Sequence, residues 1–109
     1  MNKRDQSQVA QELSILENNL QHLLMQRQAL EAQLGEINTA LIEVSKSKGD
    51  IYHVTGQVML KASKEEITKE LESKKKIIDS RLLAVDKQEK LLDFKAQELQ
   101  KEVRDSSKE

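Results

Sequence analysis

The residue types that could carry catalysis or hold a metal are few in this chain and are poorly spaced for either task. His22 and His53 fall on different predicted elements, and neither has a Cys, His or carboxylate partner at a spacing that metal sites use. Cysteine is absent, so the sequence offers no thiolate ligand and no disulfide. Ser, His and Asp occur without a turn motif that would fix a nucleophile. We therefore predict no catalytic residue, no metal and no cofactor, and we do not expect an enzyme.

Charge and sequence motifs also argue against nucleotides, nucleic acids and membranes as partners. No Gly-Lys-Ser/Thr sequence is present to hold phosphates. The 18 basic and 19 acidic residues give a net charge of −1, which provides no field to attract nucleic acid or acidic lipid. The basic run Lys74-Lys75-Lys76 is surrounded by acidic residues, as on a solvated helix face. No stretch approaches the roughly 20 apolar residues of a membrane span, and no secretory signal is visible, so we expect a cytoplasmic protein.

The elements that must position any functional surface are long helices. The chain has 109 residues, of which 34% are charged and 2% aromatic, and it contains no proline and three glycines. This composition is typical of coiled coils, and the length allows at most one ordinary domain, over residues 1–109. Apolar residues spaced alternately by four and three predict a first helix over about residues 6–47, with Arg27 as its only charged break. Its seam is Val9, Leu13, Leu16, Leu20, Leu23, Arg27, Leu30, Leu34, Ile37, Leu41 and Val44.

The same spacing returns in the second half of the chain and predicts a second helix over about residues 64–103. Ser63 and Glu66 form a capping box at its start, and a polar tail follows over residues 104–109. Its seam has two charged breaks, Lys75 and Glu89. In an antiparallel pairing, Glu89 falls about one turn from Arg27, so these two residues are expected to pair. The seam is Leu71, Lys75, Ile78, Leu82, Val85, Glu89, Leu92, Ala96, Leu99 and Val103.

Between the helices the periodicity changes. Gly49 is expected to cap the end of the first helix, and two β-favouring runs around a glycine-containing turn predict one hairpin over about residues 51–62. A hairpin of this length can return the chain on itself. The predicted fold class is therefore mainly α: a long antiparallel two-helix coiled coil joined by a single β-hairpin. One hairpin is marginal in water, and its edges invite pairing with another chain.

The centre of the chain resembles the β class of prefoldin subunits. The resemblance is carried by Ile51–Lys61 (IYHVTGQVMLK), by Lys64–Leu71 (KEEITKEL) and, in the second helix, by Lys87–Leu92 (KQEKLL). It implies a hexamer of two α-class and four β-class subunits whose hairpins join into an intersubunit β-barrel. It also implies an ATP-independent co-chaperone that holds unfolded polypeptides at the tips of its coiled-coil arms and passes them to a group II chaperonin.

Apolar residues away from the seam are the expected client-contact residues. They occupy heptad positions c, e and f, in the half of each helix nearest the termini, where they add nothing to the seam. Incidental exposure and packing against a neighbouring subunit are the alternatives. The expected client-contact residues are Ile15, Leu24, Met25, Leu91 and Phe94.

Hairpin residues are expected to build the assembly. Gly56 is expected to supply a positive φ or a close backbone approach in the turn. A competing hypothesis is a coiled-coil scaffold, without chaperone activity, that oligomerises through the same hairpin. The expected oligomerisation residues are Tyr52, Val54, Gly56, Val58 and Leu60.

Overall fold

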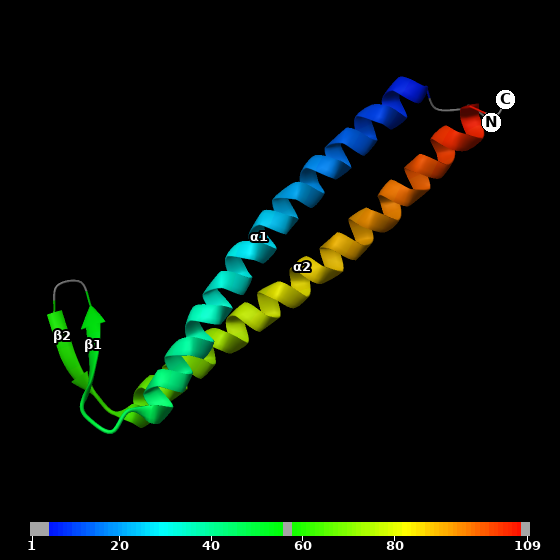
Figure 1. Ribbon diagram of the computed structural model, residues 1–109. Coiled ribbons are helices and arrows are strands. Elements are labelled where there is room, and N and C mark those ends of the chain that lie inside the picture. Colours follow the sequence, from blue (N-terminus) through cyan, green and yellow to red (C-terminus); the bar gives the residue numbers. More distant parts are fainter. Residues whose placement is uncertain (1–4, 56–57, 108–109) are drawn as a thin grey trace. The chain divides into compact units, whose positions relative to one another are not determined.

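The computed structural model describes residues 5–55 and 58–107. Helix α1 spans Gln6–Lys46, strand β1 spans Ile51–Thr55, strand β2 spans Val58–Ala62 and helix α2 spans Lys64–Ser107 (Figure 1). The two strands pair antiparallel with each other. The predicted fold class, two long helices with one β-hairpin between them, is confirmed.

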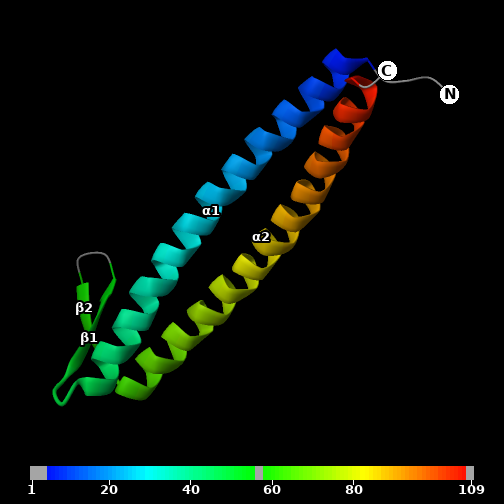
Figure 2. The same cartoon turned by 45° about the vertical axis from the view of Figure 1, so that its right-hand side comes forward.

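The chain divides into two compact units. Unit 1 holds residues 1–28 and 83–109, and unit 2 holds residues 29–82, which include the hairpin. Within each unit a segment of α1 lies beside a segment of α2 that runs in the opposite direction, as both views show (Figures 1 and 2). The prediction that residues 1–109 form a single domain stays a prediction.

The heptad seam accounts for burial along both helices. Every predicted seam residue of α1 and α2 is buried or half-buried, including the charged breaks Arg27, Lys75 and Glu89. The spacing of about 3.5 residues therefore places one apolar stripe of each helix against the other, as in a left-handed coiled coil. The most deeply buried apolar residues are Val9, Leu23, Ile78, Val85, Ala96 and Leu99.

Side-chain caps fix where the helices begin. The Ser63 hydroxyl accepts a hydrogen bond from the Glu66 backbone N–H at 3.1 Å, which confirms the Ser63 half of the predicted capping box of α2. At the start of α1, Asp5 takes the same role, because its carboxylate accepts a hydrogen bond from the Ser7 backbone N–H at 3.1 Å. The Asp5 carbonyl also accepts the first backbone bonds of the helix. Sequence reasoning missed this aspartate cap.

The ends of the helices differ from the predictions. Helix α1 ends at Lys46, three residues before Gly49. Just after this end, the Ser47 backbone N–H donates a hydrogen bond to the carbonyl of Val44, three residues earlier. Gly49 has no positive φ, so the predicted glycine cap is wrong. The Lys64 ammonium instead donates to the Ser45 carbonyl at 3.0 Å, a common way to satisfy an orphan helix carbonyl. Helix α2 continues to Ser107, whereas the sequence pattern predicted an end near Val103.

The hairpin register is simple and local. Five antiparallel pairs run from Ile51 with Ala62 to Thr55 with Val58. Next to the first pair, the Lys61 ammonium lies 3.5 Å from the Asp50 carboxylate, and both side chains are exposed. Two five-residue strands are too little for an independently stable sheet, so the hairpin depends on whatever packs against it.

Candidate functional site

The five residues predicted to contact clients are all exposed and all belong to unit 1. Their exposed fractions are 60% for Ile15, 42% for Leu24, 65% for Met25, 56% for Leu91 and 60% for Phe94. Each lies off the seam of a helix whose seam positions are covered, so the exposure follows from the heptad frame. Their role in binding stays a prediction.

Among the residues whose burial the structure describes, four further large apolar side chains are exposed. Leu83 belongs to unit 1, whereas Ile42, Tyr52 and Ile77 belong to unit 2, with exposed fractions between 51% and 56%. Tyr52 was predicted as a hairpin residue, but sequence reasoning did not single out the other three. The signal was available, since Ile42 and Leu83 occupy heptad position b and Ile77 position c of the same frames.

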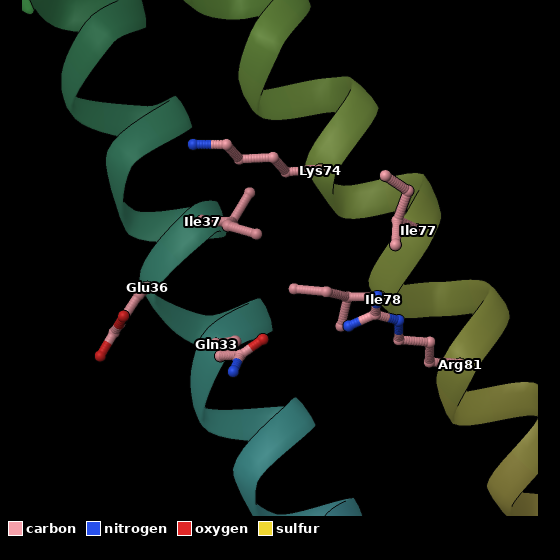
Figure 3. Close-up of a pocket in the computed structure, with 7 residues that line it drawn as sticks. All are labelled: Gln33, Glu36, Ile37, Lys74, Ile77, Ile78 and Arg81. Carbon is pink, nitrogen blue, oxygen red and sulfur yellow. The ribbon is translucent and has the colours of Figure 1, made fainter.

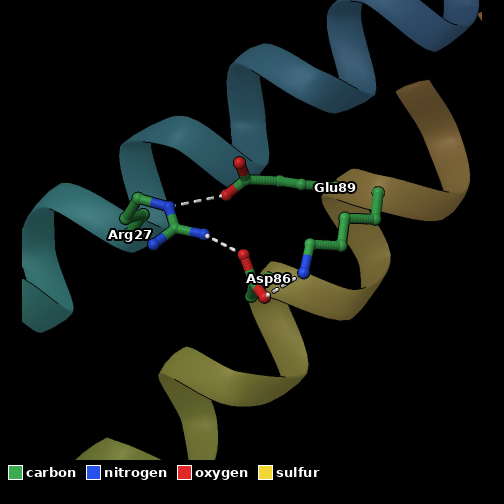
Figure 4. Close-up of polar contacts among 4 residues, drawn as sticks. Arg27, Asp86 and Glu89 are labelled. Atoms are coloured by element: carbon green, nitrogen blue, oxygen red, sulfur yellow. Dashed lines mark hydrogen bonds and ion pairs between the residues drawn. The ribbon is translucent and has the colours of Figure 1, made fainter.

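A charged cluster interrupts the seam of unit 1 (Figure 4). The Arg27 guanidinium donates from Nε to Glu89 at 2.8 Å and from an Nη atom to Asp86 at 3.3 Å. Asp86 also forms an ion pair with Lys90, which lies one turn further along α2. The Lys90 Nζ atom is 3.2 Å from the Asp86 carboxylate. The predicted Arg27–Glu89 pair is present, and Asp86 is a second partner that sequence reasoning missed.

The cluster shifts the acid–base equilibria of its members. The hydrogen bond to Glu89 is the largest influence on Arg27 and raises the pKa of its guanidinium. The hydrogen bond and charge of Lys90, followed by the charge of Arg27, lower the pKa of Asp86 below its ordinary value of 3.8. Both shifts favour the charged forms of Arg27 and Asp86. The cluster joins α1 to α2 within unit 1.

A groove of about 420 Å³ lies in unit 1 between the two helices. Leu23 and Leu92 belong to the covered seam, whereas Leu91 is exposed. Neither the α1 side nor the α2 side of the groove contributes a charged carboxylate, ammonium or guanidinium group. The groove is lined by Asn19, His22, Leu23, Gln88, Leu91 and Leu92.

A second groove, of about 300 Å³, lies between the segments of α1 and α2 in unit 2. Ile37 and Ile78 point toward each other across the two helices, and the Lys74 side chain extends toward α1 (Figure 3). Charged groups surround this apolar pair. The lining residues are Gln33, Glu36, Ile37, Lys74, Ile77, Ile78 and Arg81.

The hairpin residues expected to build the assembly are only partly described. Tyr52 is 51% exposed on β1 and pairs in register with Lys61. Val54 pairs with Met59, and Thr55 pairs with Val58, so the backbone brings the predicted residues into one small sheet. Leu60 pairs with His53. Gly56 lies outside the described residues. The oligomerisation role of these five residues stays a prediction.

The described residues, 5–55 and 58–107, bear on metal binding and on membrane insertion. In that part of the chain, no three His, Cys, Asp or Glu side chains gather as a metal site would require. Neither described helix combines the length and the apolar character needed to cross a membrane.

Comparison with known proteins places these features in a family. The prefoldin subunit family model matches residues 6–109. The prefoldin subunit beta of Sulfurisphaera tokodaii is 33% identical over 93 residues, which cover 84% of this chain and 74% of that protein. The prefoldin subunit beta of Pyrococcus furiosus is 32% identical over 94 residues, which cover 84% of this chain and 80% of that protein.

A solved structure supports the same assignment. The crystal structure of the prefoldin beta subunit from Thermococcus strain KS-1 is similar to this chain with a TM-score of 0.88 at 28% identity. The match covers 96% of this chain and 95% of that one. This chain belongs to the prefoldin subunit family, a family of chaperones, and the predicted resemblance to the β class is confirmed.

Proposed function

We propose that this chain is a subunit of an ATP-independent co-chaperone that captures unfolded polypeptides on its coiled-coil arm and delivers them to a group II chaperonin. The observation that carries the proposal is the set of apolar side chains exposed in unit 1 of a prefoldin-family fold, headed by Ile15, Met25 and Phe94. These side chains add nothing to the seam, yet they leave apolar surface in water, which is typical of an interaction surface.

The proposed assembly is a hexamer of two α-class and four β-class subunits in the cytoplasm. The described hairpin has two strands with unpaired edges, so joining the hairpins of several subunits into a β-barrel would satisfy those edges. Tyr52, Val54, Val58 and Leu60 would then fill the barrel or its subunit contacts, with Gly56 in the turn. Neither nucleic acid nor a membrane is a proposed partner.

Capture would be weak at each arm and strong in sum. One buried apolar side chain contributes at most about 1.5–3 kcal/mol, and the ordering of a disordered client offsets part of this gain. Several arms that hold one client raise the overall affinity without any new type of contact. The mechanism therefore needs exposed surface and assembly but no covalent chemistry.

The test is suppression of the aggregation of a chemically denatured client, measured by light scattering. We expect the assembled variant Ile15→Ser/Phe94→Ser to protect the client several-fold less well than the parent, and the addition of Leu91→Ser to increase the loss. The matched control is Ile42→Ser/Ile77→Ser, which removes two apolar side chains of similar exposure from unit 2.

Two outcomes would contradict the proposal. Equal protection by the parent and the unit 1 variants, with assembly intact, would exclude these residues as the client surface. No protection by the parent at any concentration would instead favour the coiled-coil scaffold that oligomerises through its hairpin.

A further inference from the structure

Two edges of helix α2, one on each side of its outward face, carry complementary patterns of charged and apolar side chains. The first borders the groove of unit 2 and is called the groove edge: Glu70, Lys74, Ile77 and Arg81, at heptad positions c and g. The second is called the opposite edge: Asp79, Leu83, Asp86 and Lys90, at positions e and b. We propose that the groove edge of one copy of this chain binds the opposite edge of a second copy, with the two α2 helices antiparallel.

Each edge has one large apolar side chain at its centre. Ile77 is 52% exposed and Leu83 is 56% exposed, and neither belongs to the seam. Beside Ile77 the groove of about 300 Å³ is also lined by Ile37 and Ile78, which point toward each other (Figure 3). An apolar side chain that packs on Ile77 at this groove removes apolar surface from water on both partners.

The spacing of the charges matches when the two helices run antiparallel. On the groove edge, cations stand three residues before and four residues after Ile77. On the opposite edge, carboxylates stand four residues before and three residues after Leu83. Reversing one helix therefore places each cation opposite a carboxylate once the two apolar residues meet. The opposed pairs are Ile77 with Leu83, Lys74 with Asp86, Arg81 with Asp79 and Glu70 with Lys90.

Charge also selects the direction of the second helix. The antiparallel alignment opposes residues at equal distances on either side of Ser80, and over residues 70–90 it creates no pair of like charges. A parallel alignment that joins the same two apolar residues would instead place Arg81 opposite Lys87. Like charges opposed across an interface are costly, so the sequence of α2 favours the antiparallel contact.

Half of the proposed charge cluster is already formed within one chain. The Lys74 Nζ atom lies 3.4 Å from the Glu70 carboxylate, and the Lys90 Nζ atom lies 3.2 Å from the Asp86 carboxylate (Figure 4). Bringing the two edges together joins these ion pairs into one cluster of alternating sign. A carboxylate accepts several hydrogen bonds, so Asp86 can keep its contacts within the chain and still accept one from the second copy.

Arg81 and Asp79 complete the contact and are unused within the chain. Among the described residues, neither side chain forms an ion pair or a hydrogen bond, and both are exposed. On the α1 side of the groove, Glu36 is exposed, and Lys87, one turn beyond Leu83 on the second copy, carries the opposite charge. The Arg81 and Asp79 pair is therefore the cleanest one to test.

The contact has the properties of a weak, repeating association. Exposed ion pairs contribute little each and are screened by salt, and only two large apolar side chains meet. Each copy carries both edges, so the contact is heterologous and can continue from copy to copy. It uses neither the hairpin nor the proposed client residues, so it is separate from the proposed assembly and from client capture.

The experiment follows self-association of the full-length protein by sedimentation velocity at rising protein concentration. We expect the mass of the parent to rise at high concentration, and added salt to reduce the rise. Arg81→Glu and Asp79→Arg should each weaken this association several-fold, because each opposes like charges. Asp79→Arg/Arg81→Glu restores the opposite signs and should associate as the parent does. The control Lys101→Glu makes the same change of net charge outside the aligned stretch and should also behave as the parent.

Cross-linking tests the alignment directly. In a mixture of isotope-labelled and unlabelled protein, a carbodiimide joins amines to neighbouring carboxylates. We expect mixed cross-links between Lys74 of one copy and Asp86 of the other, and these should disappear at high salt.

Three results would overturn the inference: a mass of the parent that does not change with concentration, a charge-swapped variant as weak as the single variants, or mixed cross-links confined to the hairpin or to unit 1. Circular dichroism melting separates a weak association from a folding defect, since the substituted positions are exposed. Suppression of client aggregation tests the proposed function separately, and neither Arg81 nor Asp79 is a proposed client contact.

Discussion

The two units are built from the same two helices, yet they divide burial and exposure differently. Among the described residues, unit 1 contains all the buried apolar side chains except Ile78, and it also carries six of the nine large apolar side chains that are exposed. Among the residues whose burial the structure describes, unit 2 has one buried side chain, Ile78, together with a largely half-buried seam. The fully buried seam residues, apart from Ile78, thus lie in unit 1, which also presents most of the exposed large apolar side chains of the described residues.

This difference suggests that the two units have separate roles. Because Ile15 and Phe94 lie off the seam of unit 1, its packing does not need them, and they remain available for the proposed client binding. Unit 2 has fewer fully buried side chains among its described residues and a two-stranded sheet, so we expect it to gain more stability from packing against other subunits. We therefore expect the proposed assembly through unit 2 and the proposed capture through unit 1 to be altered by different mutations, and the predictions below test that separation.

The largest expected effect is on assembly. Val58→Asp/Leu60→Asp places two charges on β2, so we expect the oligomer to be lost while most of the helical signal remains. Sedimentation velocity gives the mass, and circular dichroism gives the helix content. The control Ile42→Ser/Ile77→Ser, also in unit 2, should assemble normally. An unchanged mass for the charged variant would remove the hairpin from the assembly interface.

The next effect concerns the packing of unit 1. Leu23→Ala should lower the free energy of unfolding by about 2–3 kcal/mol, since Leu23 is 8% exposed and its truncation leaves a cavity. The neighbouring Leu24 is 42% exposed, so Leu24→Ala should cost only about 0.5 kcal/mol. Urea unfolding of both variants measures the difference. Equal losses of stability for the two variants would mean that Leu23 does not lie in a covered seam of unit 1.

Much of this fold could be predicted from the sequence because a coiled coil repeats one local rule. The heptad spacing identified the covered positions of both helices and the exposure of Phe94, and the capping-box motif identified the Ser63 cap. It also anticipated the Arg27–Glu89 pair, since two charged breaks at matching heights are a strong constraint.

What escaped prediction depends on geometry between the helices or on single turns. Asp86 lies off the seam, and its contact with Arg27 depends on the stagger of α1 against α2, which side-chain packing decides. The grooves arise from the same stagger. At the end of α1, the Lys64 ammonium donates a hydrogen bond to the Ser45 carbonyl, whereas the sequence pattern predicted a glycine cap there.

A smaller effect is expected in the seam of unit 1, where Arg27 and Glu89 face each other. A double-mutant cycle with Ala at both positions should give a measurable favourable coupling, since the pair is only part-exposed. Arg27→Leu/Glu89→Leu should raise the melting temperature by several degrees, because apolar residues complete the stripe. A lower melting temperature together with zero coupling would show that this charged layer does not set the register of unit 1.

The smallest expected effect is the acid response of Asp86. Its pKa is lowered in the folded chain, mainly by Lys90 and then by Arg27, so its ionised form stabilises the fold. That stabilisation is fully present above the ordinary pKa of 3.8 and is lost as the pH falls through the lower, folded value. The melting temperatures of the parent and of Asp86→Asn should therefore differ at neutral pH and converge in strong acid. In an NMR titration, Lys90→Gln should raise the pKa of the Asp86 carboxyl back toward its ordinary value of 3.8. A parent carboxyl that titrates at or above 3.8 would show that the cluster does not stabilise unit 1 in this way.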